Sequence, residues 1–267
     1  MRCLVLAKRF DEVIFATKDL KGNINYKIPY KKIIIKDDKE IFELVKELDI
    51  DMVVIDSYNI SYEFEKELHK FTKVMVIDDM YKKHFCDILL NHNISANKKR
   101  YKKLVPNFCK IQCGEKYTLL RDEFYKSYKF HNKKFTIFIG MGGVDTENLT
   151  LKILKLLHKF INIEVNIVTT KSNPNVKKLQ QYTKNKPWIK LFIDSKEVAY
   201  LMKKSDLGIV TASGFSNEYY FLKKPFIAIK VVNNQINMYN FLKKKGYFVL
   251  DGFDKYKLLQ YLKKVIV

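Results

Sequence analysis

Short apolar runs alternate with amphipathic stretches along the whole chain of 267 residues. This alternation is typical of α/β proteins whose strands are mostly parallel, because each strand must be followed by a crossover helix. In the second half the alternation starts at "KFTIFIG" (134–140) and continues to the end of the chain, which predicts a complete doubly wound domain. In the first half the pattern predicts helices near 38–48 and 61–71 and strands at 11–17, 31–36, 51–56, 73–79 and 87–91.

The first ten residues have a helical pattern, with Cys3, Leu6, Ala7 and Phe10 on one apolar face. A helix that starts at Met1 has no preceding residue to cap its first N–H groups, and in α/β proteins a helix usually follows a strand. We therefore expect a strand upstream of this helix, and a gap in the first sheet where that strand would pair.

A polar, aromatic and weakly periodic stretch, "EKYTLLRDEFYKSYKFHNKK" (115–134), separates the two halves. It is interpreted as the connection between two Rossmann-like domains, residues 1–130 and residues 131–267. In such folds ligands bind beyond the carboxyl ends of the parallel strands, so we expect a cleft between the two domains there.

The formal net charge of +21 raises the possibility of a nucleic-acid partner. Only four of the fifty basic residues are arginine, however, and proteins that read bases or fork phosphates favour arginine. The excess charge equally draws an anionic nucleotide substrate towards a cleft, and we expect no nucleic-acid partner. No apolar run has the eighteen or so residues of a membrane span and no signal peptide is recognised, so a cytoplasmic protein without a membrane partner is predicted.

Cysteine spacing raises one possible metal site. Cys109 and Cys113 form a C-x3-C pair, and His84, Cys86 and His92 lie nearby in the sequence. A zinc site usually has a C-x2-C pair and a second matched half, and neither is present. Buried thiols beside strand ends are the preferred interpretation, and no metal or cofactor is expected.

Glycines follow the strand that ends at Gly140, in "FIGMGGVDTENL", where Gly142 and Gly143 precede Asp145 and a predicted helix. Glycines at such a place let the backbone approach a phosphate, and a helix N-terminus favours negative charge. The alternative is a tight strand-to-helix turn, with Asp145 or Thr146 as the helix cap.

A second turn of this kind lies in "TASGFSNE", where a buried strand leads through Ser213 into a helix predicted from Ser216. Small residues and hydroxyls at a helix start are suited to an anion, and Asn217 lies beside them. Glu218 could accept hydrogen bonds from the two vicinal hydroxyls of a ribose, or could simply complement the helix dipole. After the next strand, Asn233, Asn234 and Gln235 could contact a sugar or cap a helix.

In the first half, polar residues follow two buried strands. Asp56, Ser57 and Tyr58 come after one, and Asp78 and Asp79 come after the next. Such paired carboxylates could carry out acid–base chemistry or bind a metal, whereas turn and cap chemistry is the preferred interpretation of Asp78 and Asp79.

Together these motifs resemble the UDP-sugar hydrolases of pseudaminic acid biosynthesis, which act on UDP-2,4-diacetamido-2,4,6-trideoxy-β-L-altropyranose. The resemblance spans nearly the whole chain and is carried by "MRCLVLA", "VVIDSYNIS", "IDDMYKKHFCDILLNHN", "CGEKYTLLRDEF", "IGMGGVD", "SNPNVKKLQ" and "TASGFSNE". It implies a GT-B fold and a metal-independent hydrolysis that releases UDP with inversion at the anomeric carbon.

The resemblance also implies roles for individual residues. UDP binding falls on Gly142, Gly143, Ser213, Ser216, Asn217 and Glu218, while Tyr58 and Asn234 match positions that face the sugar. The histidine that activates water in the family lies before the stretch matched by "MRCLVLA", so it would be upstream of Met1, and none of the five histidines in this chain matches it.

The implied partners are a UDP-sugar and water, and the chain is expected to be a monomer. Two alternatives stay open. A GT-B glycosyltransferase would use the same donor site with an alcohol acceptor, and a binder of UDP-sugar or polyanion would lack turnover because the general base is absent.

Overall fold

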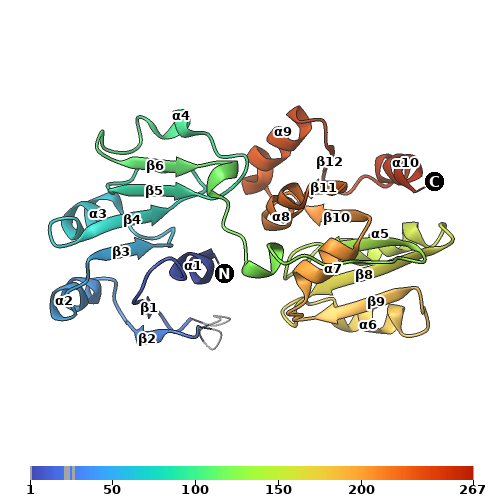
Figure 1. Ribbon diagram of the computed structural model, residues 1–267, viewed down its shortest axis with the longest axis horizontal. Helices are drawn as coiled ribbons and strands as arrows, with labels where there is room; N and C mark the ends of the chain where they lie inside the picture. Colours follow the sequence, from blue (N-terminus) through green and yellow to red (C-terminus); the bar gives the residue numbers. More distant parts are fainter. Residues whose placement is uncertain (1, 21–24, 26–27, 267) are drawn as a thin grey trace. The chain divides into compact units, whose positions relative to one another are not determined.

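The computed structural model describes residues 2–20, 25 and 28–266, which form two compact units, Met1–Leu120 and Arg121–Val267. Both are α/β units whose strands pair in parallel, as the alternating pattern predicted (Figure 1). The sequence placed the domain boundary after residue 130, whereas the unit boundary lies ten residues earlier. Residues 121–130 pack on the second unit: Phe124 is buried, and Tyr125 and Tyr128 pack edge-to-face on Phe221 and Tyr200.

Unit 1 contains two separate parallel sheets. The strands β3, β4, β5 and β6 form one sheet in that order, and β1 and β2 form the other. The described strands of this unit therefore do not form one continuous sheet. The elements of unit 1 are α1 (Arg2–Ala7), β1 (Ile14–Thr17), β2 (Lys31–Ile34), α2 (Glu40–Glu47), β3 (Met52–Ile55), α3 (Tyr62–Leu68), β4 (Lys73–Ile77), β5 (Ile88–Asn91), α4 (Lys98–Tyr101), β6 (Lys110–Cys113) and a short 3₁₀ turn, η2 (Glu115–Tyr117).

The four-stranded sheet of unit 1 is covered on both faces. Because side chains alternate along a strand, Val74 and Val76 of β4 point to one face and Met75 and Ile77 to the other. The first face packs against α2 and α3, where Leu68 is fully buried. The second face packs against Leu6 of α1. Burial on both faces explains why these strands are continuous apolar runs in the sequence.

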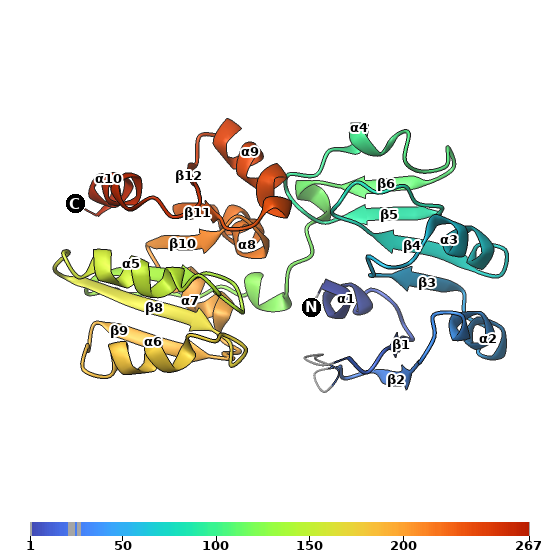
Figure 2. The same cartoon turned by 180° about the vertical axis from the view of Figure 1, so that it is seen from behind.

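Unit 2 is a doubly wound domain with a six-stranded parallel sheet in the order β12-β11-β10-β7-β8-β9. Figure 2 shows the unit from behind, with helices flanking the sheet. The elements are η3 (Asp122–Phe124), β7 (Phe135–Gly140), α5 (Leu149–Leu157), β8 (Ile163–Thr169), α6 (Val176–Thr183), β9 (Ile189–Ile193), α7 (Val198–Lys204), β10 (Leu207–Thr211), α8 (Gly214–Leu222), β11 (Phe226–Lys230), η4 (Asn233–Gln235), α9 (Ile236–Lys244), β12 (Phe248–Asp251) and α10 (Lys255–Val265).

The strand order of unit 2 changes direction between β7 and β10, which lie side by side at the centre of the sheet. The chain proceeds from β7 towards β9 on one side and from β10 towards β12 on the other. At such a switch point the two following connections diverge and leave room for a ligand at the carboxyl ends of the strands. The turns after Gly140 and after Thr211 both lie at this place.

Helix α8 is fixed on β10 by a close approach at Gly208. A Cβ at Gly208 would lie 2.4 Å from the ring of Tyr219, so only glycine allows the helix to pack this closely. The Tyr219 ring is fully buried, and its hydroxyl is 2.6 Å from Ser205 Oγ. This contact holds the start of α8, and therefore the turn from Ser213 to Glu218, in a defined position.

Candidate functional site

The loop after β7 is open at Gly142. This residue has a φ of +79°, a conformation that side chains other than glycine rarely adopt. No atom lies within 4 Å of the place where a Cβ would be, so the backbone here borders open space. The loop is fastened from the other side, because Thr170 donates a 2.6 Å hydrogen bond to the Gly143 carbonyl.

The Asp145 side chain caps α5. The sequence offered Asp145 and Thr146 as the two candidates for this cap. Its Oδ1 accepts from the Leu149 N–H at 2.8 Å and its Oδ2 accepts from the Thr150 N–H at 3.0 Å. Asn175 in turn donates its side-chain N–H to the Asp145 carbonyl at 3.0 Å. Because the carboxylate already occupies these two donors of α5, an anion at this loop would be bound by the Gly142 and Gly143 backbone and not by the first turn of the helix.

Helix α8 begins at Gly214, two residues earlier than the sequence predicted, with Ser213 at its N-cap position. Ser216 is fully buried and donates to the Thr211 carbonyl at 2.8 Å, and Asn217 is also buried. The Ser216 side chain therefore holds the turn in place. The Ser213 side chain makes no capping hydrogen bond to α8. The Ser213 hydroxyl, 2.8 Å from Thr211 Oγ1, and the N-terminus of this nine-residue helix are the features of the turn suited to an anion.

Glu218 is a mostly buried carboxylate with an incomplete set of partners. Its Oε1 lies 3.3 Å from the Arg121 guanidinium, and the side chain is 17 % exposed. Its Oε2 is buried and has no hydrogen-bond partner among the described residues. Burial raises the pKa of Glu218 to about 7, an effect that the nearby Arg121 charge opposes without cancelling. Glu218 lies beyond the first turn of α8, which argues against a simple role in complementing the helix dipole.

The amide residues after β11 lie on the 3₁₀ turn η4. Asn233 and Asn234 are exposed, whereas Gln235 accepts the Val231 N–H at 2.8 Å and so has the local capping role. Asn233 and Asn234 are therefore the amides that remain suited to contact a ligand near the carboxyl end of β11.

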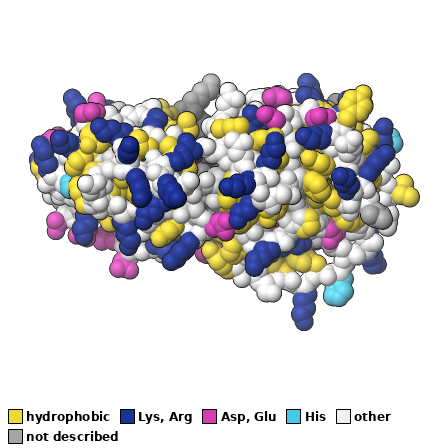
Figure 3. Space-filling view, turned by 90° about the horizontal axis from the view of Figure 1, so that it is seen from above, with side chains coloured by type: hydrophobic (Ala, Val, Ile, Leu, Met, Phe, Trp, Pro, Cys, Tyr) yellow, Lys and Arg dark blue, Asp and Glu magenta, His cyan; other side chains and the backbone are white. Residues whose placement is uncertain are grey.

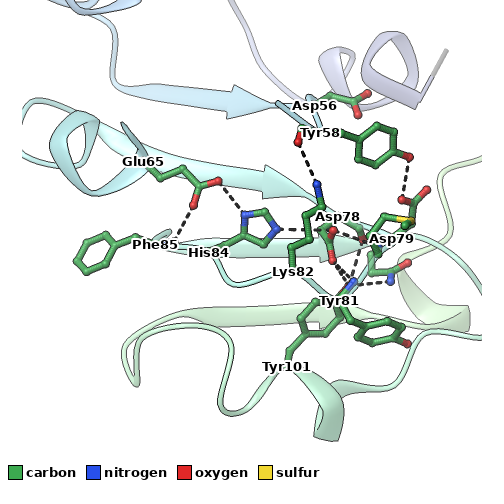
Figure 4. Close-up of polar contacts among 12 residues, drawn as sticks. Asp56, Tyr58, Glu65, Asp78, Asp79, Tyr81, Lys82, His84, Phe85 and Tyr101 are labelled. Atoms are coloured by element: carbon green, nitrogen blue, oxygen red, sulfur yellow. Dashed lines mark hydrogen bonds and ion pairs between the residues drawn. The ribbon is translucent and has the colours of Figure 1, made fainter. Parts of the chain in front are cut away.

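In unit 1 the polar residues after β3 and β4 meet at one edge of the sheet (Figure 4). The register pairs Ile55 of β3 with Val76 of β4, which brings the residues that follow these strands close together. The Tyr58 hydroxyl donates to Asp79 Oδ1 at 2.9 Å. Tyr58 is 53 % exposed, and burial of its hydroxyl end together with the Asp79 bond raises its pKa, so it stays a donor at neutral pH.

Arg2 connects the two carboxylates of this edge. Its guanidinium lies 2.6 Å from Asp56 Oδ1 and 3.0 Å from Asp79 Oδ2. Cys3 also donates to Asp56, at 2.9 Å. Burial alone would raise the pKa of Asp56, but the hydrogen bonds from Arg2 and Cys3 outweigh it and lower that pKa. The role of Arg2 could not be found from the sequence, because 54 residues separate it from Asp56.

Asp78 has the turn role that the sequence favoured for it, since its carboxylate accepts the N–H groups of Met80 and Tyr81 at 3.0 and 2.7 Å. Asp79 differs from that interpretation, because its carboxylate binds Tyr58 and Arg2.

His92 follows β5, and burial together with the Arg2 charge lowers its pKa to about 4.

The pair of cysteines in contact is not the C-x3-C pair of the sequence, Cys109 and Cys113. Cys109 Sγ lies 3.7 Å from Cys86 Sγ. Among residues 2–20, 25 and 28–266, no three or more His, Cys, Asp or Glu side chains are grouped so that they could hold a metal ion.

In the same part of the chain no helix has the length and apolar character needed to cross a membrane. Lysine and arginine side chains are spread over the face shown in Figure 3.

Comparison with known proteins gives two sequence matches. The UDP-2,4-diacetamido-2,4,6-trideoxy-beta-L-altropyranose hydrolase of Campylobacter jejuni is 42 % identical over 222 residues, which cover 81 % of this chain and 80 % of that protein. An uncharacterized protein of Methanocaldococcus jannaschii, MJ1062, is 31 % identical over 224 residues, which cover 77 % of this chain and 46 % of that protein. No family model matches the chain.

Solved structures share the fold at low sequence identity. MurG of Acinetobacter baumannii has a TM-score of 0.64 at 14 % identity, covering all of this chain and 87 % of that one. The UDP-GlcNAc 2-epimerase of Neisseria meningitidis, solved with UDP-GlcNAc bound, has a TM-score of 0.62 at 15 % identity, covering 90 % of this chain and 77 % of that one. These likenesses confirm the GT-B-like fold with two Rossmann-like units.

Proposed function

The chain belongs to the family of the UDP-2,4-diacetamido-2,4,6-trideoxy-beta-L-altropyranose hydrolase of Campylobacter jejuni, and we propose that it hydrolyses the same kind of UDP-linked sugar and releases UDP. The relative is a UDP-sugar hydrolase by name, and the match extends over four fifths of both chains. The fold is one that hosts several chemistries, so the site residues must support the assignment as well.

The observation that carries the proposal is the state of Glu218. A buried carboxylate oxygen without a donor is costly, and it is compensated when a ligand supplies one. The two vicinal hydroxyls of a ribose are such donors. We propose that Glu218 binds the uridine ribose, that the Gly142 and Gly143 backbone binds the diphosphate, and that Ser213 contributes at the start of α8, with Ser216 and Asn217 holding the turn.

Tyr58 and Asn234 are proposed to contact the sugar. Water attacks the anomeric carbon with inversion and forms the new C–O bond, while the C–O bond to the diphosphate breaks and UDP leaves. The attacking water loses one proton, which passes to solvent. The charge that develops on UDP is stabilised by oriented N–H groups and by the strongly positive chain, which carries a net charge of +21, so no metal is required.

The reaction is proposed to take place in the cytoplasm, as a step of pseudaminic acid biosynthesis, with UDP-sugar and water as the partners of a monomeric enzyme.

A test of the proposal follows UDP release from the UDP-sugar in buffer with and without an added alcohol. A hydrolase releases UDP at the same rate in both, together with free sugar. A glycosyltransferase releases UDP only with the alcohol, and a binder retains the intact UDP-sugar in both. Either of these last two results would contradict the proposal.

Replacing Tyr58 by Phe removes the hydroxyl that Asp79 holds and keeps the ring. We expect kcat to fall roughly ten- to hundredfold, because a positioned polar group at the sugar is lost, while the Kd for UDP changes less than about twofold. The matched control is Tyr62→Phe, since Tyr62 lies four residues along on α3 and packs edge-to-face on Phe85. Equal kcat values for the wild type and the Tyr58 variant would remove Tyr58 from the site.

A further inference from the structure

A buried, charged network lies directly beneath the Tyr58–Asp79 pair (Figure 4). It involves His84, Glu65 and Asp78, whose exposed fractions are 5 %, 1 % and 3 %. Charged side chains are rarely buried to this degree unless they are paired. Neither the sequence resemblance nor the proposed reaction assigns His84 or Glu65 a role.

The pairing of His84 is specific on both sides of the ring. Its Nδ1 lies 2.7 Å from Glu65 Oε1 on α3, and its Nε2 lies 3.6 Å from Asp78 Oδ1 after β4. The second oxygen of Glu65 accepts the Phe85 N–H at 2.7 Å. The ring therefore hydrogen-bonds Glu65 and lies at ion-pair distance from Asp78, while its Nε2 has no hydrogen-bond partner among the described residues.

Asp78 connects His84 to the loop that follows β4. Its Oδ2 accepts the Tyr101 hydroxyl at 2.6 Å as well as the Tyr81 N–H. Tyr81 has a φ of +59°, which is uncommon for a bulky residue, and it stacks on the Tyr101 ring with centroids 4.6 Å apart. A residue with such backbone angles is stable only when surrounding contacts fix it, and the hydrogen bond from the Tyr81 N–H to Asp78 is such a contact.

Asp79 is the next residue of this loop, and it is the acceptor of the Tyr58 hydroxyl. If the contacts of the Asp78 carboxylate changed, the position of Asp79 would therefore change, and the Tyr58 hydroxyl would move with it. Displacements of about 1 Å at a reacting group can cost on the order of a hundredfold in rate.

Resting on the proposed hydrolysis, we propose that His84 is a positioning residue: as an imidazolium between Glu65 and Asp78, it fixes the 78–84 loop so that Asp79 orients the Tyr58 hydroxyl. His84 itself does not touch the substrate, because it is buried beneath that loop. Its effect on the reaction is exerted through Asp79 and Tyr58.

The protonation state of His84 supports this role and predicts a pH dependence of kcat that can be measured. Burial alone would lower its pKa, but the nearby carboxylates of Asp78 and Glu65 outweigh it and raise the pKa to about 9. Other titratable groups near the network are Tyr101, which is bonded to Asp78, and the thiols of Cys86 and Cys109, which interact with Glu65 and with His84 respectively. His84 is thus charged at pH 7 and loses its charge as the pH rises through about 9.

The experiment compares the pH dependence of kcat for the wild type and for His84→Gln. We expect the kcat of the wild type to decline with a midpoint near pH 9, and that of the variant to be roughly ten- to hundredfold lower at pH 7 without this decline. The matched control is His69→Gln. His69 also pairs with a carboxylate, Asp87 at 3.1 Å, but Asp87 binds the N–H of Val74 near the start of β4, at the other end of the strand.

Two further variants separate positioning from a general loss of structure. Glu65→Gln keeps His84 but removes one of its negative partners, so the alkaline midpoint of kcat should shift to lower pH by about one unit or more. In a Tyr58→Phe background, His84→Gln should have little further effect on kcat, since the group that it positions is gone. The Kd for UDP should stay within about twofold in every variant.

The outcomes distinguish the two proposals. If the wild type releases no UDP from the UDP-sugar, the proposed function fails. If the wild type is active, but the alkaline decline is unchanged in Glu65→Gln, or the effects of the His84 and Tyr58 changes multiply fully, the positioning role of His84 is overturned while the hydrolase stands.

Discussion

Replacing Glu218 by Gln is expected to stabilise unit 2 at pH 8 and to weaken UDP binding at the same time. The pKa of Glu218 lies near 7 in the folded protein against 4.5 for an ordinary glutamate. The folded state therefore binds the carboxyl proton more tightly than the unfolded state, and the free energy of unfolding decreases as the pH rises from about 4.5 to 7. Above pH 7 the ionised carboxylate costs about 3 kcal/mol, which a neutral amide avoids.

The same substitution removes the acceptor proposed for the ribose hydroxyls. Hydrogen bonds to a charged group contribute about 1.5–3 kcal/mol each, so the Kd for UDP should rise roughly ten- to hundredfold. Opposite signs for stability and affinity are the expected signature of a group kept for binding at the expense of the unliganded fold.

Urea unfolding at pH 5 and pH 8 measures the first effect, and calorimetric titration with a UDP-sugar at pH 8 measures the second. The control is Glu123→Gln, because Glu123 also pairs with Arg121, at 3.5 Å, but is 39 % exposed. A Glu218→Gln protein that is less stable than the wild type at pH 8, or that binds UDP as tightly, would contradict the role proposed for Glu218.

Replacing Asp145 by Ala is expected to have the second large effect, a loss of about 2–4 kcal/mol in the free energy of unfolding. The side chain accepts two buried N–H groups at the start of α5, and each buried donor left without a partner costs about 1–3 kcal/mol. Because Asp145 also fixes the end of the 140–145 loop, the affinity for UDP should fall as well.

Asp254→Ala is the matched control for Asp145→Ala. Asp254 is also a helix cap, but it accepts one N–H, that of Lys257, at an exposed site on α10. Its loss should cost about 1 kcal/mol and leave UDP binding unchanged. Denaturant unfolding of both variants checks the comparison. Equal losses of stability would mean that the second hydrogen bond and the burial at Asp145 contribute nothing.

The alternation of strands and helices in unit 2 could be predicted because each buried strand is a continuous apolar run. The prediction failed where local sequence carries little signal. The strand β6, "KIQC", is only four residues long, and its position depends on pairing with β5. The start of α8 was placed at Ser216 and lies at Gly214. Glycine has a low helix propensity, so the local sequence does not favour a helix start at Gly214.

The candidate site could be predicted only in part. Glycines, hydroxyls and carboxylates after strands are visible in the sequence, because parallel strands bring their carboxyl ends together. Partners from distant segments are not visible: Arg121 lies 97 residues from Glu218, and Glu65 lies 19 residues from His84 on another element. The assignment of Asp79 to a turn failed for this reason, since its partners Tyr58 and Arg2 come from other segments.

Hydrolysis at the anomeric carbon is tested most directly by running the reaction in ¹⁸O-labelled water and weighing both products by mass spectrometry. The label is expected in the anomeric hydroxyl of the released sugar, with none in UDP, because water forms its new bond to carbon. Label in the UDP phosphate would show cleavage of the P–O bond, and no release of UDP without an alcohol would mean a transferase or a binder without turnover. Either result would contradict the proposed function.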